Sequence, residues 1–220
     1  MWVIGSLASR SWSRTPATCV AITATPAKKP HAAWRPKSVA AIRRAIASLD
    51  PVGRLELGFF GGEPLLEAPA LRRWIDLARQ SARQTGVEVS FHLTTNGTID
   101  SAAAWDVLSQ DDLHVAVSFD GLPAAHDRFR IYADGRGTSA AVTRTIQRLL
   151  ALGKPLSVVM VVRPETAGGL PAGIRHLRAL GVQSIEPSLD LWTHWTREDA
   201  AVLRRAIAEA AELWVHPEPN

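Results

Sequence analysis

Hydrophobic positions repeat with two different periods along most of the chain, and the two periods alternate. Short runs in which apolar residues are continuous or occupy every second position are typical of strands. Between them lie segments in which apolar residues recur every three or four positions, as on one face of a helix. Strands are therefore expected at 55–60, 87–95, 113–119, 156–162 and 182–187. Helices are expected at 37–48, 71–85, 102–108, 142–150, 170–180 and 196–214.

This alternation predicts an α/β fold in which right-handed βαβ units form a parallel sheet, closed into a barrel or into part of one. The helix at 37–48 precedes the first visible strand, whereas a βα series should place a strand before it. The residues upstream show no clear period, so the first strand is expected to be missing or distorted. We therefore divide the chain into an irregular basic segment, 1–36, and a partial barrel core, 37–220.

Charge is distributed unevenly along the chain. The formal net charge is +4, but residues 1–49 hold eight basic residues and no acid, so the remainder has 17 basic and 21 acidic residues. This remainder lacks a basic patch with interleaved aromatic residues, which argues against a nucleic-acid partner. The composition, 46% hydrophobic and 21% charged, is that of a soluble globular protein, and no apolar run approaches membrane-spanning length. We expect a cytoplasmic protein with no membrane partner.

The first segment, 1–36, has three interpretations. Its Ser, Thr, Ala and Pro content is compatible with a disordered tail. Its arginines and its lack of acids also resemble an organelle transit peptide. The third interpretation, a shifted reading frame, depends on the motifs described below. The segment contains the single cysteine, Cys19. One cysteine rules out a disulfide framework and cannot by itself hold an iron–sulfur cluster or a structural zinc.

Polar motifs follow three of the predicted strands at the ends where parallel α/β folds bind ligands. They are Gly61-Gly62-Glu63-Pro64, Thr94-Thr95-Asn96-Gly97 and Ser118-Phe119-Asp120-Gly121, and His126-Asp127-Arg128-Phe129-Arg130 comes shortly after the third. A bare Gly-Gly backbone beside a carboxylate suits a ligand with an amino group, although a strand-to-helix turn also needs glycine. Asn-Gly and Asp-Gly are ordinary turns, and the His-Asp pair is either an acid/base pair or part of an ordered loop. Their common place at one rim favours a binding site.

Taken as an ordered set over residues 37–190, these motifs resemble the radical S-adenosylmethionine (SAM) enzymes. The resemblance is to the peptide- and protein-modifying, SPASM-type branch, which includes the anaerobic sulfatase maturases. It implies a partial (β/α)6 barrel around a [4Fe–4S] cluster and SAM. In such enzymes an electron donor reduces the cluster, SAM is cleaved, and the resulting radical abstracts a hydrogen from a peptide or protein substrate.

The resemblance also assigns residues to SAM. The positions that match the family's SAM contacts are Gly61, Gly62, Glu63, Asn96, Ser118 and Arg130. The Gly-Gly-Glu segment matches the one that holds the methionine amino group. The arginine could pair the methionine carboxylate in a bidentate fork. No catalytic residue and no metal ligand is assigned.

One feature of the family is missing. Radical SAM enzymes bind the cluster through three cysteines spaced CxxxCxxC after the first strand, and this chain has only Cys19. As written, the chain is expected to be an inactive radical SAM core, so whether it is an enzyme stays open. The alternatives are a non-catalytic SAM- or peptide-binding barrel remnant and an organelle-targeted barrel lyase with a basic leader. Related maturases often carry a further C-terminal cluster domain; because this chain stops at Asn220, directly after a predicted helix, we expect that domain to be absent or to have been cut off.

A shifted reading frame over residues 1–38 would account for the missing cysteines. When the third base of each codon is read with the first two of the next, a junction before alanine reads NGC, which includes a cysteine codon. Such junctions at Pro16/Ala17, Val20/Ala21 and Thr23/Ala24 have the spacing CxxxCxxC. The shifted frame can spell L-V-T-N-A-C-N-L-R-C-D-Y-C-Y-A-G-E-K, a strand followed by the family's cluster loop. Chance is the alternative, because alanine is common in this segment.

Overall fold

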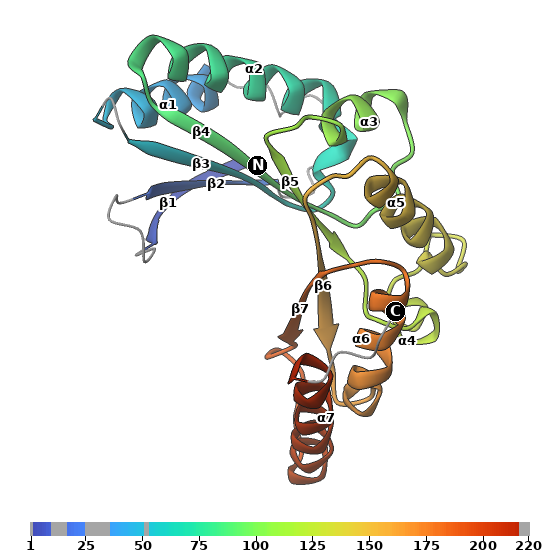
Figure 1. Ribbon diagram of the computed structural model, residues 1–220. Coiled ribbons are helices and arrows are strands. Elements are labelled where there is room, and N and C mark those ends of the chain that lie inside the picture. The colour runs from blue at the N-terminus through green and yellow to red at the C-terminus, as the bar shows by residue number, and fades with distance from the viewer. Residues whose placement is uncertain (1, 10–16, 25–35, 51–52, 216–220) are drawn as a thin grey trace. The chain divides into compact units, whose positions relative to one another are not determined.

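The computed structural model describes residues 2–9, 17–24, 36–50 and 53–215 (Figure 1). These residues belong to two compact units. The first unit holds the residues up to Thr95 together with Ile99–Ala116, and the second holds Asn96–Thr98 together with the chain from Val117 onward. The chain therefore leaves the first unit at the end of one strand and again partway through the next.

The first unit is built on neighbouring strands that follow the chain order. These are β1 (Trp2–Ser9), β2 (Ala17–Ala24), β3 (Arg54–Gly61), β4 (Glu88–Thr95) and the start of β5 (Leu113–Ser118). β1 and β2 are antiparallel, whereas β2 runs parallel to β3 and β3 parallel to β4. The parallel strands arise from the predicted βα alternation.

Strand β2 stands where the hydrophobic pattern predicted that the first strand would be missing or distorted. It pairs with β3 over eight residues, from Ala17 opposite Arg54 to Ala24 opposite Gly61. The segment is rich in Ala and Thr, so it carries little of the apolar contrast by which a strand is found from sequence. β1 and β2 are also regular elements within 1–36, which the pattern described as irregular.

The first unit's helices cover one face of its strands (Figure 1). They are α1 (Pro36–Ala47), the 3₁₀ turn η1 (Pro64–Glu67), α2 (Ala68–Thr85) and α3 (Ala102–Leu108). β3 alternates, so Leu55, Leu57 and Phe59 are buried. The Phe59 ring stacks with Trp74 of α2 at 6.4 Å and with Phe91 of β4 at 6.3 Å between centroids. These aromatic contacts are the centre of the core that supports the carboxyl end of β3.

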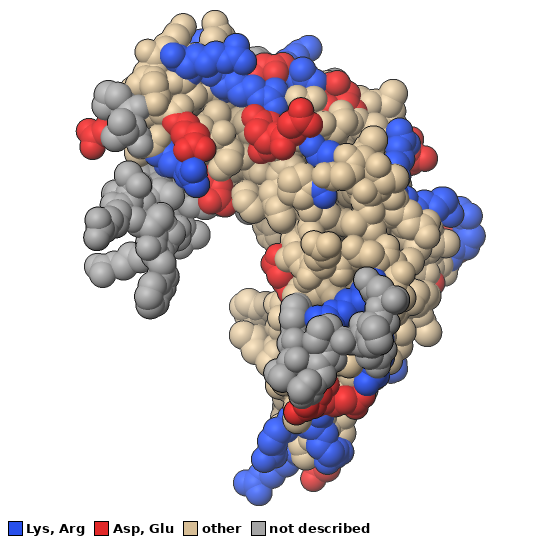
Figure 2. Space-filling model, viewed as in Figure 1, with Lys and Arg blue, Asp and Glu red and all other residues tan. Residues whose placement is uncertain are grey.

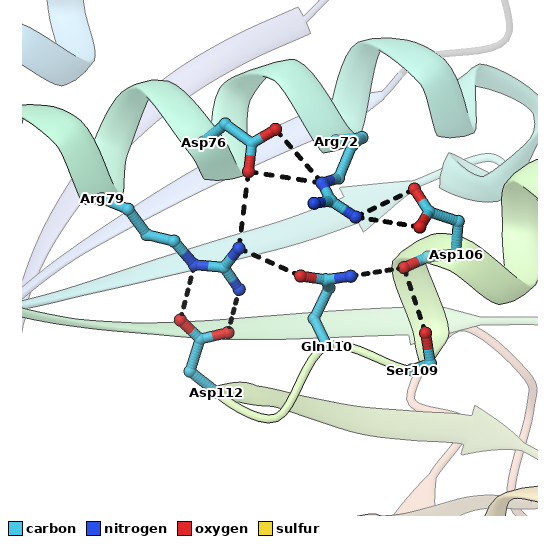
Figure 3. A network of polar contacts seen from close by, with 7 residues as sticks. All are labelled: Arg72, Asp76, Arg79, Asp106, Ser109, Gln110 and Asp112. Carbon is cyan, nitrogen blue, oxygen red and sulfur yellow. Dashed lines mark hydrogen bonds and ion pairs between the residues drawn. The ribbon is translucent and has the colours of Figure 1, made fainter.

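The exposed side of α2 is charged with both signs (Figure 2). Arg72 pairs with Asp76 one turn along the helix and with Asp106 of α3. Arg79 forms a bidentate pair with Asp112, ahead of β5, and its Nη1 also donates to Gln110 at 3.0 Å (Figure 3). These pairs join α2 to the segment that leads into β5.

The second unit contains the end of β5 and the remaining elements. They are α4 (Pro123–Asp127), α5 (Ser139–Ala151), β6 (Leu156–Val162), η2 (Ala167–Gly169), α6 (Leu170–Ala179), β7 (Ser184–Leu189) and α7 (Arg197–Val215). β6 and β7 are parallel, with Val158 opposite Ile185. The residue that follows β5 is hydrogen-bonded to β6, because Phe119 N donates to Val159 O at 3.0 Å.

The predicted alternation of strands and helices is confirmed from β3 to β7, and the fold class is α/β. In α7, Ala206, Ala210 and Leu213 are buried, whereas Ile207 is 50% exposed. α7 packs on α6 and η2.

Within the described ranges, no helix combines the length and the apolar character that crossing a membrane requires.

Candidate functional site

The first part of the site lies where β3 ends. Gly61 has φ of 131°, a conformation that favours glycine, and Gly62 is exposed. Glu63 then caps the turn η1, because its Oε1 accepts a hydrogen bond from Leu65 N at 3.0 Å. The same oxygen accepts a hydrogen bond from Thr95 Oγ1 at 2.9 Å. A carboxylate is thus held directly after the Gly-Gly segment, and a carboxylate is an acceptor that suits an ammonium group.

Thr95 was not singled out from the sequence, although it lies inside a motif that was. It is the last residue of β4 and is 1% exposed. Since β3 and β4 are parallel neighbours, their carboxyl ends lie together, and this brings Thr95 to Glu63 across 32 positions of sequence. The only sequence signal was a polar residue at a strand end.

Asn96 closes a turn of its own in the second unit. Its Oδ1 accepts hydrogen bonds from Thr98 N at 2.9 Å and from Thr98 Oγ1 at 2.7 Å. Gly97 has φ of 70°, and a Cβ there would lie 3.1 Å from Val117 and Val142. The turn therefore packs against β5 immediately before Ser118, which is half-buried. The structure brings these two predicted SAM contacts into one region of the second unit.

Arg130 is held by Asp120. Its Nε donates to Asp120 Oδ2 at 2.8 Å, and its Nη2 donates to Asp120 Oδ1 at 3.1 Å. The aspartate is itself fixed, because its Oδ1 also accepts from Val161 N of β6 at 3.1 Å. The Asp120 side chain is 4% exposed and the Arg130 side chain 29% exposed. Asp120 therefore occupies one edge of the guanidinium, and a ligand carboxylate would meet Arg130 on the edge that carries Nη1.

His126 is a buried structural residue and does not pair with Asp127. The residue is buried, and its ring stacks on Phe119 with 4.6 Å between the ring centroids. Burial lowers the pKa of His126 to about 4; the charge of Asp120 opposes this, and that of Arg130 adds to it. The histidine is therefore neutral near pH 7 and has no access to a ligand, so the acid/base interpretation is wrong.

Asp127 accepts hydrogen bonds from the first residue of the next helix, α5, instead. It accepts hydrogen bonds from Ser139 N at 2.8 Å and Ser139 Oγ at 2.6 Å, at the start of α5. Burial raises the pKa of Asp127, but these hydrogen bonds outweigh it and bring the pKa below its ordinary value. Gly137 makes room for this contact, because a Cβ there would lie 2.1 Å from Asp127 Cγ.

The residues present do not fit an iron–sulfur cluster. Such a cluster is held by cysteine thiolates, and the full sequence has a single cysteine, Cys19. This residue lies within β2, opposite Glu56 in the register of β3. Across 2–9, 17–24, 36–50 and 53–215, no group of three or more His, Cys, Asp or Glu residues could hold a metal ion.

Comparison with known proteins identifies the family. The model of the Radical SAM superfamily matches residues 24–177, which is more than half of the chain. The chain therefore belongs to the radical SAM superfamily. This confirms the resemblance inferred from the strand-end motifs.

Two of the curated relatives are sulfatase-maturating enzymes. The chain is 30% identical over 177 residues to a serine-type anaerobic sulfatase-maturating enzyme of Klebsiella aerogenes, covering 79% of this chain and 42% of that enzyme. It is 29% identical over the same length to the corresponding enzyme of Klebsiella pneumoniae. The chain thus spans less than half the length of these relatives.

Solved structures share the fold. One, described as native anSMEcpe with bound AdoMet and Cp18Cys peptide, has a TM-score of 0.71 and 18% identity. The match covers 82% of this chain and 53% of that one. A second structure of anSMEcpe, with AdoMet and a Kp18Cys peptide, has a TM-score of 0.72. These matches confirm the partial parallel barrel predicted from the sequence.

Proposed function

We propose that this chain is the SAM-binding core of a peptide-modifying radical SAM enzyme. The observation that carries the proposal is the end of β3, where Gly61 and the exposed Gly62 precede a carboxylate that Thr95 holds in place. This arrangement provides a fixed carboxylate acceptor for an ammonium group. Membership of the radical SAM superfamily makes the methionine amino group of SAM the candidate donor.

The carboxylate of the same methionine moiety is assigned to Arg130. The exposed edge of its guanidinium can form charge-assisted hydrogen bonds to a carboxylate. Asn96 and Ser118, at the carboxyl ends of β4 and β5, are proposed to contact the rest of SAM. Hydrogen-bonding groups of this kind orient a cofactor, and its reactive chemistry belongs to the cofactor itself.

A peptide or protein is the proposed substrate class. The support comes from the relatives: the two Klebsiella enzymes are named as sulfatase-maturating enzymes, and anSMEcpe was solved with a bound peptide. A polypeptide side chain would be the group from which hydrogen is removed. An external electron donor is part of the same proposal.

We propose further that the chain as written does not cleave SAM. A single cysteine cannot supply the thiolates of a [4Fe–4S] cluster. We therefore expect this protein to bind SAM without cleaving it. The non-catalytic alternative, a barrel that binds SAM without using it, has the same single-cysteine observation in its favour.

Calorimetric titration with three ligands tests SAM binding. SAM carries both the amino and the carboxylate group, 5′-methylthioadenosine lacks both, and methionine lacks the adenosine. We expect SAM to bind at least about tenfold more tightly than 5′-methylthioadenosine, since each charge-assisted hydrogen bond contributes about 1.5–3 kcal/mol. Equal affinity for the two adenosine ligands would contradict the assigned amino and carboxylate contacts.

Anaerobic reconstitution with iron and sulfide tests the second proposal. The expected result is no stoichiometric iron and no 5′-deoxyadenosine formed from SAM under reducing conditions. About four irons per chain, the content of one cluster, together with SAM cleavage would overturn it. SAM binding without iron would support the non-catalytic core.

A further inference from the structure

Arg130 belongs to a closed ring of hydrogen bonds in the second unit, and most of that ring lies outside the proposed ligand contacts. Its side chain pairs with Asp120, as described above. Its main-chain oxygen accepts hydrogen bonds from Thr138 Oγ1 at 2.9 Å and from Thr138 N at 3.2 Å. The residue is therefore anchored at both ends, by an aspartate at the guanidinium and by a threonine at the backbone.

His126 closes the ring between these two anchors. Its Nδ1 accepts a hydrogen bond from Asp120 N at 3.2 Å, and its Nε2 lies 2.9 Å from Thr138 Oγ1. Because Nδ1 is an acceptor, the proton of the neutral ring is on Nε2 and is donated to the threonine oxygen. The threonine hydroxyl hydrogen is then directed to Arg130 O. Each donor in the ring thus has a single acceptor.

The ring is buried apart from its arginine. His126 is 0% exposed, Thr138 6% and Asp120 7%. Buried polar groups that are all satisfied hold one geometry, because any rearrangement leaves at least one of them without a partner. The one partly exposed member is Arg130, so the ring fixes a single cationic group that faces solvent.

We infer that His126 and Thr138 are positioning residues that set the direction of the Arg130 guanidinium for an α-amino acid carboxylate. The inference rests on the proposed function, since SAM is the ligand that carries this carboxylate. Neither residue is expected to touch the ligand. Their effect reaches it through the main-chain oxygen of Arg130 and through the main-chain nitrogen of Asp120.

The test is a pair of substitutions read out by two ligands. Thr138→Val keeps the shape of the side chain but removes the hydroxyl, and Thr138→Ser restores it. We expect Thr138→Val to weaken SAM binding about five- to tenfold, which corresponds to the loss of one or two neutral hydrogen bonds. Binding of 5′-methylthioadenosine, which has no carboxylate, should be unchanged, and Thr138→Ser should recover most of the SAM affinity.

A matched control is Thr85→Val, which removes a hydroxyl bonded to the main chain within α2, a helix without a named site residue. Thr85→Val should change neither the affinity for SAM nor the affinity for 5′-methylthioadenosine. If Thr138→Val lowers thermal stability but leaves the ratio of the two affinities as in the wild-type chain, the ring is only structural and the inference is wrong. If the wild-type chain itself binds no SAM, the proposed function fails first, and the inference falls with it.

The hydrogen-bond pattern can be measured without a ligand. ¹⁵N NMR of the imidazole should show His126 as the Nε2–H tautomer, and the Arg130 Nε–H should exchange slowly. In Thr138→Val the Arg130 Nε–H is expected to exchange faster, while Thr138→Ser resembles the wild-type chain. An Nδ1–H tautomer at His126 would overturn the inference whatever the SAM affinity.

Discussion

Thr95 Oγ1 donates a hydrogen bond to Glu63 Oε1 at 2.9 Å, and this contact joins the ends of β4 and β3. The same carboxylate oxygen accepts a hydrogen bond from Leu65 N at 3.0 Å. Thr95 is 1% exposed, so water does not compete for its hydroxyl group. The relationship places a carboxylate beside the Gly-Gly segment before any ligand arrives.

Replacing Thr95 with valine should destabilise the first unit. The substitution keeps the side-chain shape and leaves Glu63 with one fewer donor, so the free energy of unfolding should fall by about 1–2 kcal/mol. Chemical denaturation measures this change. Thr95→Ser keeps the donor and should cost clearly less. Equal stability of Thr95→Val and the wild-type chain would contradict the role of this hydrogen bond.

The stability of the chain should fall between pH 6.5 and pH 4 because of His126. Burial lowers its pKa to about 4 in the folded chain, so over this range the unfolded chain binds a proton that the folded chain excludes. The full difference corresponds to about 3 kcal/mol. Unfolding free energies across this range should show a smaller pH dependence for His126→Gln than for the wild-type chain. Carboxylates titrate in both proteins, so only the difference between the two profiles tests the prediction.

Two glycines with similar positive φ angles should respond differently to substitution by alanine. Gly121 has φ of 81°, and a Cβ there would lie 2.6 Å from Met160 Sδ and 2.9 Å from Gly173 Cα. Gly135 has φ of 83° but nothing within 4 Å. Gly135→Ala should therefore cost only the backbone strain, about 1 kcal/mol, whereas Gly121→Ala should also disrupt packing and cost roughly 2–4 kcal/mol. Similar thermal midpoints for the two variants would argue against close packing at Gly121.

Arg79 should matter more for stability than Arg72, although both belong to the network of Figure 3. The Arg79 side chain is 20% exposed, forms a bidentate pair with Asp112 and lies 5.5 Å from the centre of the Phe91 ring. Arg72 is 35% exposed and pairs with aspartates that are more than half exposed. We expect Arg79→Ala to cost roughly 1.5–3 kcal/mol and Arg72→Ala less than about 1 kcal/mol. A double-mutant cycle with Asp112→Ala measures the coupling for Arg79.

The source DNA should encode the cluster cysteines in another frame. The junctions Pro16/Ala17, Val20/Ala21 and Thr23/Ala24 have the required spacing, and the family match begins at residue 24. Resequencing from upstream of the start codon to the codon of Ala40 should find TGC across all three junctions. Any other base at these positions means that this gene never encoded the cluster at this place, and the chain would then be a core without one.

The local elements could be predicted from the sequence because their signals are local. The apolar period of α2, with Leu71, Trp74 and Ile75 buried, is set by the repeat of the helix itself. Gly86 ends this helix with φ of 74°, as a C-terminal glycine does. The strand-end motifs follow from the same alternation, and they were sufficient to identify the family.

The contacts that give the site its chemistry were decided only by the tertiary structure. Thr95 reaches Glu63 because parallel strands bring their carboxyl ends together. His126 reaches Thr138 because the segment between them folds back on itself, with Ile131 opposite Gly137. Neither contact can be read from the hydrophobic pattern of the sequence, because each is a hydrogen bond between residues 32 or 12 positions apart. The sequence by itself thus determined the elements, their order and the residue types at the rim. The packing of those elements decided which side chains form hydrogen bonds with one another.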